Sequence, residues 1–427
     1  MIINGKEDIL NPGYYTVSES ISNVIRIEFK MDADVDGTAL QRAAEYALRR
    51  YTYFAVKAVI SGNSYLNVEN ENLFTVSSGI RRIRLLSEES AYYPLAIQYE
   101  GERLALDISH ALTDGHGLLP FVKTLLYYYI CFSTGVSYAA GDISTVETPI
   151  FDDELGNPDD KIDYDSITKP LCARPAVENP FTLADIGLKN VGKKTAHYFQ
   201  IDETMFMRYV KSVGGSPTAV MTAMLAEIMW ELSLTDRSLY IGVAIDHRPM
   251  LGNLHSYRSL SNLVPVVYER KQRGLSIEKL CSFARETVRL QADRQNVLYF
   301  RKQMLEGSKK MEMVPSIEKK RELLKGRIEQ SLGRYSCTFS YPGIVDLGEA
   351  GAHIKALKAL ADTVADNCLS AEMLAFGGAF HLSLIQGFDD DIIAKEVMRH
   401  LDAEGIHYEY MGSEMLRLST AVPFNNT

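Results

Sequence analysis

Several features that point to a particular compartment or partner are scarce in this sequence of 427 residues. The five cysteines form no C-x-x-C pair and have no histidine at metal-ligand spacing, so we expect ordinary reduced thiols. No apolar run approaches the ~18 residues that a membrane span needs. The stretch from Met1 to Asp8 lacks a positive segment followed by an apolar core, so no secretory signal is expected. These absences together favour a cytoplasmic protein without a membrane span.

Basic blocks are also lacking, and the net charge is −10 with a pI near 5.5. An acidic chain of this kind argues against nucleic acid or an anionic membrane surface as the main partner. The length suffices for roughly two domains and a substantial buried core.

The most informative stretch runs from His110 to Gly117 and reads His-Ala-Leu-Thr-Asp-Gly-His-Gly. Leu104, Leu106 and Ile108 share one parity with His110, which is the two-residue period of a half-buried strand. After Asp114 and Gly115, apolar residues return at helical spacing, at positions 118, 121, 122 and 125. The stretch is thus predicted to be strand, tight loop and helix, with His110 at the strand end. A partly desolvated histidine facing a cavity there is suited to act as a general base.

From the residues alone, a plainer interpretation of this stretch stays open. A histidine beside apolar residues is often a hydrogen-bonded core residue, and an Asp-Gly pair is often only a turn. The pattern His-x-x-x-Asp-Gly at this place in the chain, however, resembles the chloramphenicol-acetyltransferase-like acyltransferases. That superfamily includes alcohol acetyltransferases, polyketide-associated acyltransferases and condensation domains. His110, Asp114 and Gly115 match its central motif, and Gly117 matches a glycine often found after it.

The domain organisation is predicted from a change of pattern between residues 135 and 194. This stretch holds five prolines, at 149, 158, 170, 175 and 180, and an acidic run from Asp152 to Asp165 that we expect to be a solvated surface. So long a loop is unusual within one compact domain, so it is interpreted as a linker. We expect an N-terminal subdomain over 1–175, which ends in the linker, and a C-terminal subdomain over 176–427.

The second half carries further segments that resemble the superfamily. A buried-looking strand ends in Asp246-His-Arg-Pro, which resembles an Asp-x-Arg motif whose arginine reaches the aspartate of the histidine motif. Ser261-Asn262 resembles a Gly-Asn segment, with serine in place of glycine. Thr338-Phe-Ser-Tyr-Pro-Gly resembles the Ser-Asn-x-Gly segment of alcohol acetyltransferases, which makes Ser340 a candidate donor to an oxyanion. The plain alternatives are a charged strand end at Arg248 and a turn serine at Ser340.

The resemblance implies an α/β fold of the α+β type. It consists of two similar subdomains, each a mostly antiparallel sheet with helices, around a central tunnel. It also implies direct acyl transfer from a thioester, with acyl-CoA as co-substrate and no bound cofactor. In that mechanism His110 takes the proton of an alcohol or amine acceptor. Asp114 holds the geometry, and we expect it to pair with Arg248. No metal is expected, because Asp389 to Asp391 are explained as acids at a helix start.

Two alternatives to an acyl-CoA-dependent enzyme of the alcohol acetyltransferase kind remain. The first takes its acyl group from an acyl carrier protein, as in lipid or peptide natural-product synthesis. Condensation domains usually have two adjacent histidines, whereas Ser109 precedes His110 here. The second is a catalytically silent scaffold of the same fold. The acceptor and the length of the acyl chain are not specified by any motif.

Overall fold

The computed structural model describes residues 13–17, 21–233, 235–363 and 368–421. Met1 to Asp8, on which the expectation about a secretory signal rests, lie outside the described residues. Within the described part of the chain, no helix combines the length and the apolar character that spanning a membrane requires.

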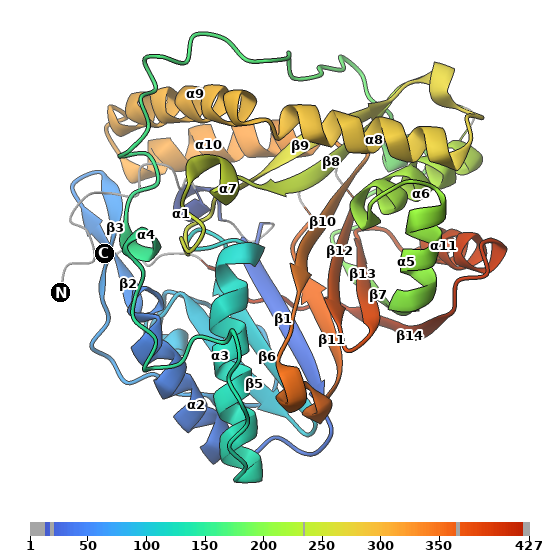
Figure 1. Ribbon diagram of the computed structural model, residues 1–427. Coiled ribbons are helices and arrows are strands. Elements are labelled where there is room, and N and C mark those ends of the chain that lie inside the picture. Colours follow the sequence, from blue (N-terminus) through green and yellow to red (C-terminus); the bar gives the residue numbers. More distant parts are fainter. Residues whose placement is uncertain (1–12, 18–20, 234, 364–367, 422–427) are drawn as a thin grey trace.

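The first of two large sheets has five strands in the order β11-β1-β6-β5-β4. Strands β5 and β6 form a hairpin, and Gly101 provides the left-handed residue of its turn. Helices α2 and α3 pack together against this sheet (Figure 1). The bounds are β1 Val24–Met31, β4 Ser77–Ser78, β5 Leu95–Glu100, β6 Arg103–Ser109, β11 Ile354–Leu360, α2 Gly37–Arg50 and α3 Gly115–Thr134.

The second sheet has seven strands in the order β14-β7-β13-β12-β10-β8-β9. Its pairs are antiparallel except that β10 runs parallel to both β8 and β12. Helices α5, α6 and α11 lie at one side of it in Figure 1. The bounds are β7 Thr195–Asp202, β8 Leu239–Asp246, β9 Ser261–Tyr268, β10 Cys337–Ile344, β12 Leu369–Phe376, β13 Ala379–Gln386, β14 Tyr408–Met415, α5 Glu203–Ser212, α6 Pro217–Leu232 and α11 Ile392–Ala403.

Helix α6 shows how local sequence sets the start of an element. The Ser216 side chain accepts a hydrogen bond from the Ala219 N–H, and Pro217 occupies the first helical turn, where a missing N–H has no cost. The remaining elements are α1 Gly13–Thr16, β2 Val56–Ser61, β3 Ser64–Glu69, α4 Asp152–Leu155, α7 Arg248–Leu251, α8 Ile277–Gln291, α9 Arg294–Glu312 and α10 Ile317–Leu332. Short 3₁₀ turns cover Thr52–Phe54, Glu88–Ser90, Leu183–Ile186, Arg270–Gln272 and Gly348–His353.

The two halves of the chain are joined by strand β11, which comes from the second half and completes the first sheet. It pairs antiparallel with β1, so that Ile27 lies opposite Ala359. Leu357 of β11 and Phe376 of β12 also belong to the apolar core beneath the first sheet. The division of the chain into subdomains at residue 175 stays a prediction. It does not assign each sheet to one subdomain, because β11 comes from the second half and belongs to the first sheet.

The linker is held to the body of the protein by two buried ion pairs. Arg50 donates to both carboxylate oxygens of Glu154, at 2.9 and 2.6 Å, and Arg301 donates from Nη2 to Asp159 at 2.8 Å. All four of these side chains are buried. The expectation of a solvated acidic surface over 152–165 is therefore wrong for Glu154 and Asp159, because each carboxylate meets a guanidinium that compensates its desolvation.

Candidate active site

A cavity of about 680 Å³ lies where the two sheets meet. One wall is apolar and comes from β1, β11 and the start of α3, while β8, β9, β10 and β12 supply several of the polar groups. His110, Asn262 and Ser340 all line it, although they are far apart in the sequence. Three of the side chains named from the sequence therefore face one space.

His110 follows the last residue of β6 and precedes the loop that leads into α3. Its backbone N–H donates to the carbonyl of Asn23 at 2.9 Å, which fixes the end of the strand. Within the described part of the chain, no side-chain hydrogen bond engages the imidazole, which is partly accessible and lines the cavity. Its ring nitrogens are thus available to a ligand in the cavity.

Asp114 points away from the cavity and begins helix α3. Its Oδ1 accepts the N–H of Gly117 at 2.9 Å, which caps the helix, and its Oδ2 accepts the N–H of Leu260 at 2.7 Å. The same two oxygens receive the guanidinium of Arg248, at 2.8 Å from Nη2 and 3.2 Å from Nη1. Asp114 therefore ties the loop after His110 to the second half of the chain.

Arg248 uses all five of its N–H donors at this junction. Besides the two bonds to Asp114, Nη1 donates to Asp246 at 2.7 Å, and the other two donors reach the carbonyls of Ser256, at 2.8 Å, and Arg258, at 2.5 Å. The side chains of Arg248 and Asp114 are 3% and 1% exposed. A planar guanidinium fits this set of acceptors, whereas an ammonium does not.

The electrostatic state of Asp114 follows from these contacts. Burial alone would raise the pKa of the carboxyl, but the Arg248 guanidinium and the N–H groups of Gly117 and Leu260 hold it below its ordinary value. Asp114 is therefore a fixed anion and takes no part in proton transfer at neutral pH.

Gly115 and Gly117 are required by close approaches in this loop. A Cβ at Gly115 would lie 2.7 Å from Cγ of Pro342 on β10, and a Cβ at Gly117 would lie 2.3 Å from the carbonyl oxygen of Tyr257. Gly115 thus allows the His110 loop to contact the strand that carries Ser340, and Gly117 allows the start of α3 to pack against the backbone at Tyr257.

Ser340 and Asn262 differ in how they are held. Ser340 lies opposite Glu372 of the neighbouring strand β12 in the register of the sheet, and its hydroxyl acts to lower the pKa of that carboxyl. The Asn262 side chain accepts from the N–H of Leu263 at 2.8 Å and has only a long contact, 4.0 Å, to the sulfur of Met304. Ser340 belongs to a network, and Asn262 does not.

Glu372 is a cavity residue that the sequence analysis missed. It lies on β12, and burial raises the pKa of its carboxyl to about 7. A single acid within the otherwise uncharged strand Leu-Ser-Ala-Glu-Met-Leu-Ala-Phe is the sequence signal that could have revealed it. Arg174 and Arg334 also line the cavity and were not named from the sequence.

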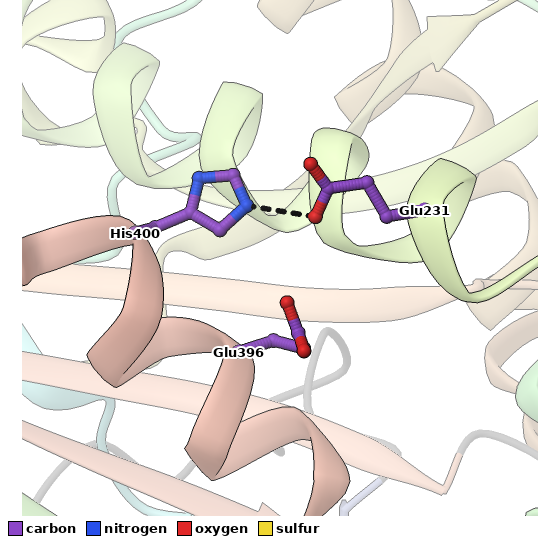
Figure 2. A group of neighbouring side chains, drawn as sticks. All are labelled: Glu231, Glu396 and His400. Atoms are coloured by element: carbon purple, nitrogen blue, oxygen red, sulfur yellow. Dashed lines mark hydrogen bonds and ion pairs between the residues drawn. The ribbon is translucent and has the colours of Figure 1, made fainter. Parts of the chain in front are cut away.

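A second group of side chains with metal-ligand chemistry lies away from the cavity, on α6 and α11. Figure 2 shows Glu231, Glu396 and His400, with His400 Nε2 3.1 Å from Glu231. Arg399 also hydrogen bonds to Glu231, and its Nε donates to Glu396 at 2.6 Å. Because this guanidinium already balances the carboxylates on an accessible surface, the group is explained as an ion-pair network.

Comparison with known proteins supports the fold at low sequence identity. No family model matches the chain, and no curated protein matches it in sequence. TRI101 from F. graminearum, in complex with coenzyme A and deoxynivalenol, has a TM-score of 0.58 at 13% identity over 94% of this chain and 98% of that one. Polyketide synthase associated protein 5 from Mycobacterium tuberculosis has a TM-score of 0.57 at 15% identity, over 90% and 96% of the two chains.

A third similar structure is the condensation domain of the Monacolin K polyketide synthase MokA. Its TM-score is 0.57 at 13% identity, over 92% of this chain and 94% of that one. Together these structures show that the chain shares the fold of TRI101, polyketide synthase associated protein 5 and this condensation domain, which confirms the fold that the His-x-x-x-Asp-Gly resemblance implies.

Proposed function

We propose that the protein is an acyltransferase that moves an acyl group from a thioester to an alcohol or amine within the cavity. The observation that carries this proposal is the placement of His110. Its imidazole lines a cavity large enough for a small-molecule ligand, while Asp114 and Arg248 fix the loop that presents it. The similarity of the fold to TRI101, whose structure holds coenzyme A, supports a thioester of CoA as the donor.

In the proposed reaction, no covalent enzyme intermediate forms. A ring nitrogen of His110 takes the proton from the acceptor O–H or N–H while that atom attacks the thioester carbonyl. The carbonyl oxygen becomes an oxyanion, and the Ser340 hydroxyl is the donor proposed to stabilise it. When the intermediate collapses, the C–S bond breaks and the thiolate takes the proton back from His110.

Asp114 and Gly115 have positioning roles in this scheme. Asp114 has every oxygen engaged by Arg248 and backbone N–H groups, so it orients the loop and not the imidazole itself. Gly115 lets the loop contact Pro342 and thereby sets the distance between His110 and the Ser340 strand. Displacement of catalytic groups by about 1 Å is enough to lose much of a proximity effect.

The His110→Ala variant tests the role of the base. We expect turnover to fall by ~10²–10⁴ with little change in melting temperature, because within the described residues no side-chain hydrogen bond holds the ring. The matched control is His116→Ala, since His116 is an exposed histidine of the same motif outside the cavity lining. Near-normal turnover in folded His110→Ala would refute the proposal.

The donor and acceptor classes are tested by thiol release. Acetyl-, butyryl- and octanoyl-CoA are each incubated with primary alcohols and primary amines of graded length, and free CoA thiol is measured. Acceptor-dependent release that disappears in His110→Ala supports an acyl-CoA enzyme. Release only from an acylated, pantetheinylated carrier protein supports the carrier-dependent alternative. No release from any donor contradicts transfer and leaves a binding or scaffold protein.

A further inference from the structure

Glu372 lies at the centre of a row of hydroxyl groups on the cavity-facing side of the second sheet. In the register of the strands it is opposite Ser340 on β10 and opposite Ser383 on β13. The Ser370 Oγ donates to its Oε1 at 2.9 Å, and the Thr338 hydroxyl is 3.0 Å from the Ser370 hydroxyl. The carboxyl is therefore surrounded by groups that can both donate and accept.

No cation is paired with this carboxyl among the described residues. Burial raises its pKa to about 7, and the hydrogen bonds from Ser370 and Ser340 act in the opposite direction. Both protonation states of Glu372 are therefore accessible near neutral pH. The site already described uses neither of them.

The charged and titratable groups around Glu372 are engaged elsewhere or lie across the cavity. Asp362 pairs with Lys194, Arg174 donates to the carbonyl of Leu263, and Arg334 donates to that of Val177. On the strands next to β12 and on β11, which packs against it, the titratable side chains are Cys337, Tyr341, His381, Lys355 and Lys358. Burial raises the pKa of Tyr341, which stays a neutral phenol. Lys355 and Lys358 pair with Glu102 and Glu414, and burial lowers the pKa of His381 to about 4. Cys337 stays a neutral thiol because burial raises its pKa. His110 lines the same cavity.

A serine hydroxyl has one proton, so its partner decides where that proton points. An ionised carboxylate only accepts hydrogen bonds, and Ser340 must then donate to it. A neutral carboxyl can donate its own proton to Ser340 Oγ, which leaves the Ser340 O–H free to turn toward the cavity. Only the second arrangement provides a donor for a developing oxyanion.

We propose that Glu372 is a positioning residue that sets the direction of the Ser340 hydroxyl, so that Ser340 donates into the cavity only while Glu372 is protonated. The role in catalysis rests on the proposed acyl transfer, but the coupling between the two side chains does not. Pro342, two residues beyond Ser340, contacts Gly115 of the His110 loop, so this strand is also fixed relative to the proposed base. The neutral amide of Glu372→Gln can donate to Ser340 and therefore imitates the protonated state at every pH.

The coupling is tested on the protein alone by infrared titration of the carboxyl carbonyl band. The carbonyl band of protonated Glu372 is the band that the wild type has and Glu372→Gln lacks. It should disappear as pH rises, with a midpoint near pH 7. In Ser340→Ala the midpoint should move to higher pH, because a donor to the ionised form is lost. Ser383→Ala is the control and should leave the midpoint unchanged. A wild-type midpoint below pH 5.5, or the same midpoint in Ser340→Ala, would overturn the proposal.

The direction of the Ser340 hydroxyl is tested by the carbonyl stretch of bound acetyl-CoA carrying ¹³C at C1. In the wild type this band should lie at lower frequency at pH 6 than at pH 8, because the thioester accepts from Ser340 only at the lower pH. Glu372→Gln should keep the low-frequency band at both pH values, and Ser340→Ala the high-frequency band at both. A wild-type band that does not move with pH, or a Glu372→Gln band that moves as the wild type does, would overturn it. If acetyl-CoA does not bind, the acyl-CoA proposal is contradicted, and the carboxyl titration still decides the coupling.

Discussion

Two carboxyl groups of this protein, the buried Asp114 and the half-buried Glu372, lie close to the same cavity and have opposite properties. Asp114 meets a guanidinium and two backbone N–H groups, and its pKa lies below the ordinary value. Glu372 meets only hydroxyl groups, and its pKa is raised to about 7. Desolvation acts on both in the same direction, so the partner decides which form is stable.

The difference separates a structural charge from one that can titrate. If Asp114 lost its charge, the buried guanidinium of Arg248 would keep only Asp246 as a carboxylate partner, so the charged form of Asp114 is favoured and suits it to joining two halves of the chain. A carboxyl among hydroxyls keeps hydrogen-bond partners in either state, because serine can donate or accept. Glu372 is thus suited to respond to pH, and the substitutions below test this contrast.

The largest effect is expected from breaking the pair at the junction. Arg248→Ala should lower the free energy of unfolding by about 3–5 kcal/mol, because the carboxylate of Asp114 stays buried without a cation. Asp114→Ala should cost less, because Arg248 keeps its ion pair with Asp246 at 2.7 Å. The double variant should cost less than the sum of the two single changes. Chemical denaturation of the three variants measures the cycle, and strictly additive losses would contradict the pairing.

The pair also predicts acid sensitivity. The pKa of Asp114 is lower in the folded state than in the unfolded state, where it is near 3.8. The contribution of Asp114 to the free energy of unfolding is therefore fully present above pH 3.8 and is lost as pH falls through the folded pKa. The stability of the wild type should therefore decline more steeply below about pH 4 than that of Asp114→Asn. Urea midpoints measured from pH 2.5 to 7 give this comparison, and parallel curves would argue against it.

A smaller effect is expected from crowding the contact between the motif loop and β10. Gly115→Ala places a methyl group against Pro342 and should cost about 1–3 kcal/mol, with a larger proportional loss of transfer activity than of stability. Gly326→Ala is the control, because its Cβ would meet open space on helix α10 and should stabilise by about 0.5–1 kcal/mol. Thermal melts and turnover of both variants, measured side by side, test this prediction. A Gly115→Ala variant that keeps the stability and turnover of the wild type would argue against this contact.

Glu372 should affect stability in the opposite pH range from Asp114. The pKa of Glu372 in the folded state, about 7, lies above the ordinary value of 4.5. The contribution of Glu372 to the free energy of unfolding is therefore present below pH 4.5 and is lost as pH rises to about 7. Relative to the wild type, Glu372→Gln should therefore gain about 1–3 kcal/mol between pH 4.5 and pH 8. Denaturation at the two pH values tests this, and a constant difference would mean that the carboxyl is not perturbed.

The smallest effect is expected at Asn262, which lines the cavity without a comparable network. Asn262→Ala should change the free energy of unfolding by no more than about 0.5 kcal/mol, because its one short bond is to the adjacent N–H. A loss of turnover in this variant, with stability unchanged, would assign it a direct role with substrate.

The sequence by itself determined the local elements around the proposed base. Alternation before His110 and helical spacing after Gly115 specify strand, loop and helix. The expectation that the strand is half-buried is wrong, however, because every residue of β6 after Arg103 is buried. Ser216 and Pro217 likewise mark the start of α6 locally. The pairing of Asp114 with Arg248 was predicted through the resemblance, because no local pattern connects residues 134 positions apart.

Only the tertiary structure decided which distant segments meet. In β11 the residues Ile354, Leu357 and Leu360 recur every third position, which favours neither a strand nor its pairing with β1. The contact of Gly115 with Pro342 depends on how two sheets pack. Glu372 is one acid in an apolar strand until Ser340 and Ser370 are placed beside it, and its pKa follows from that three-dimensional environment.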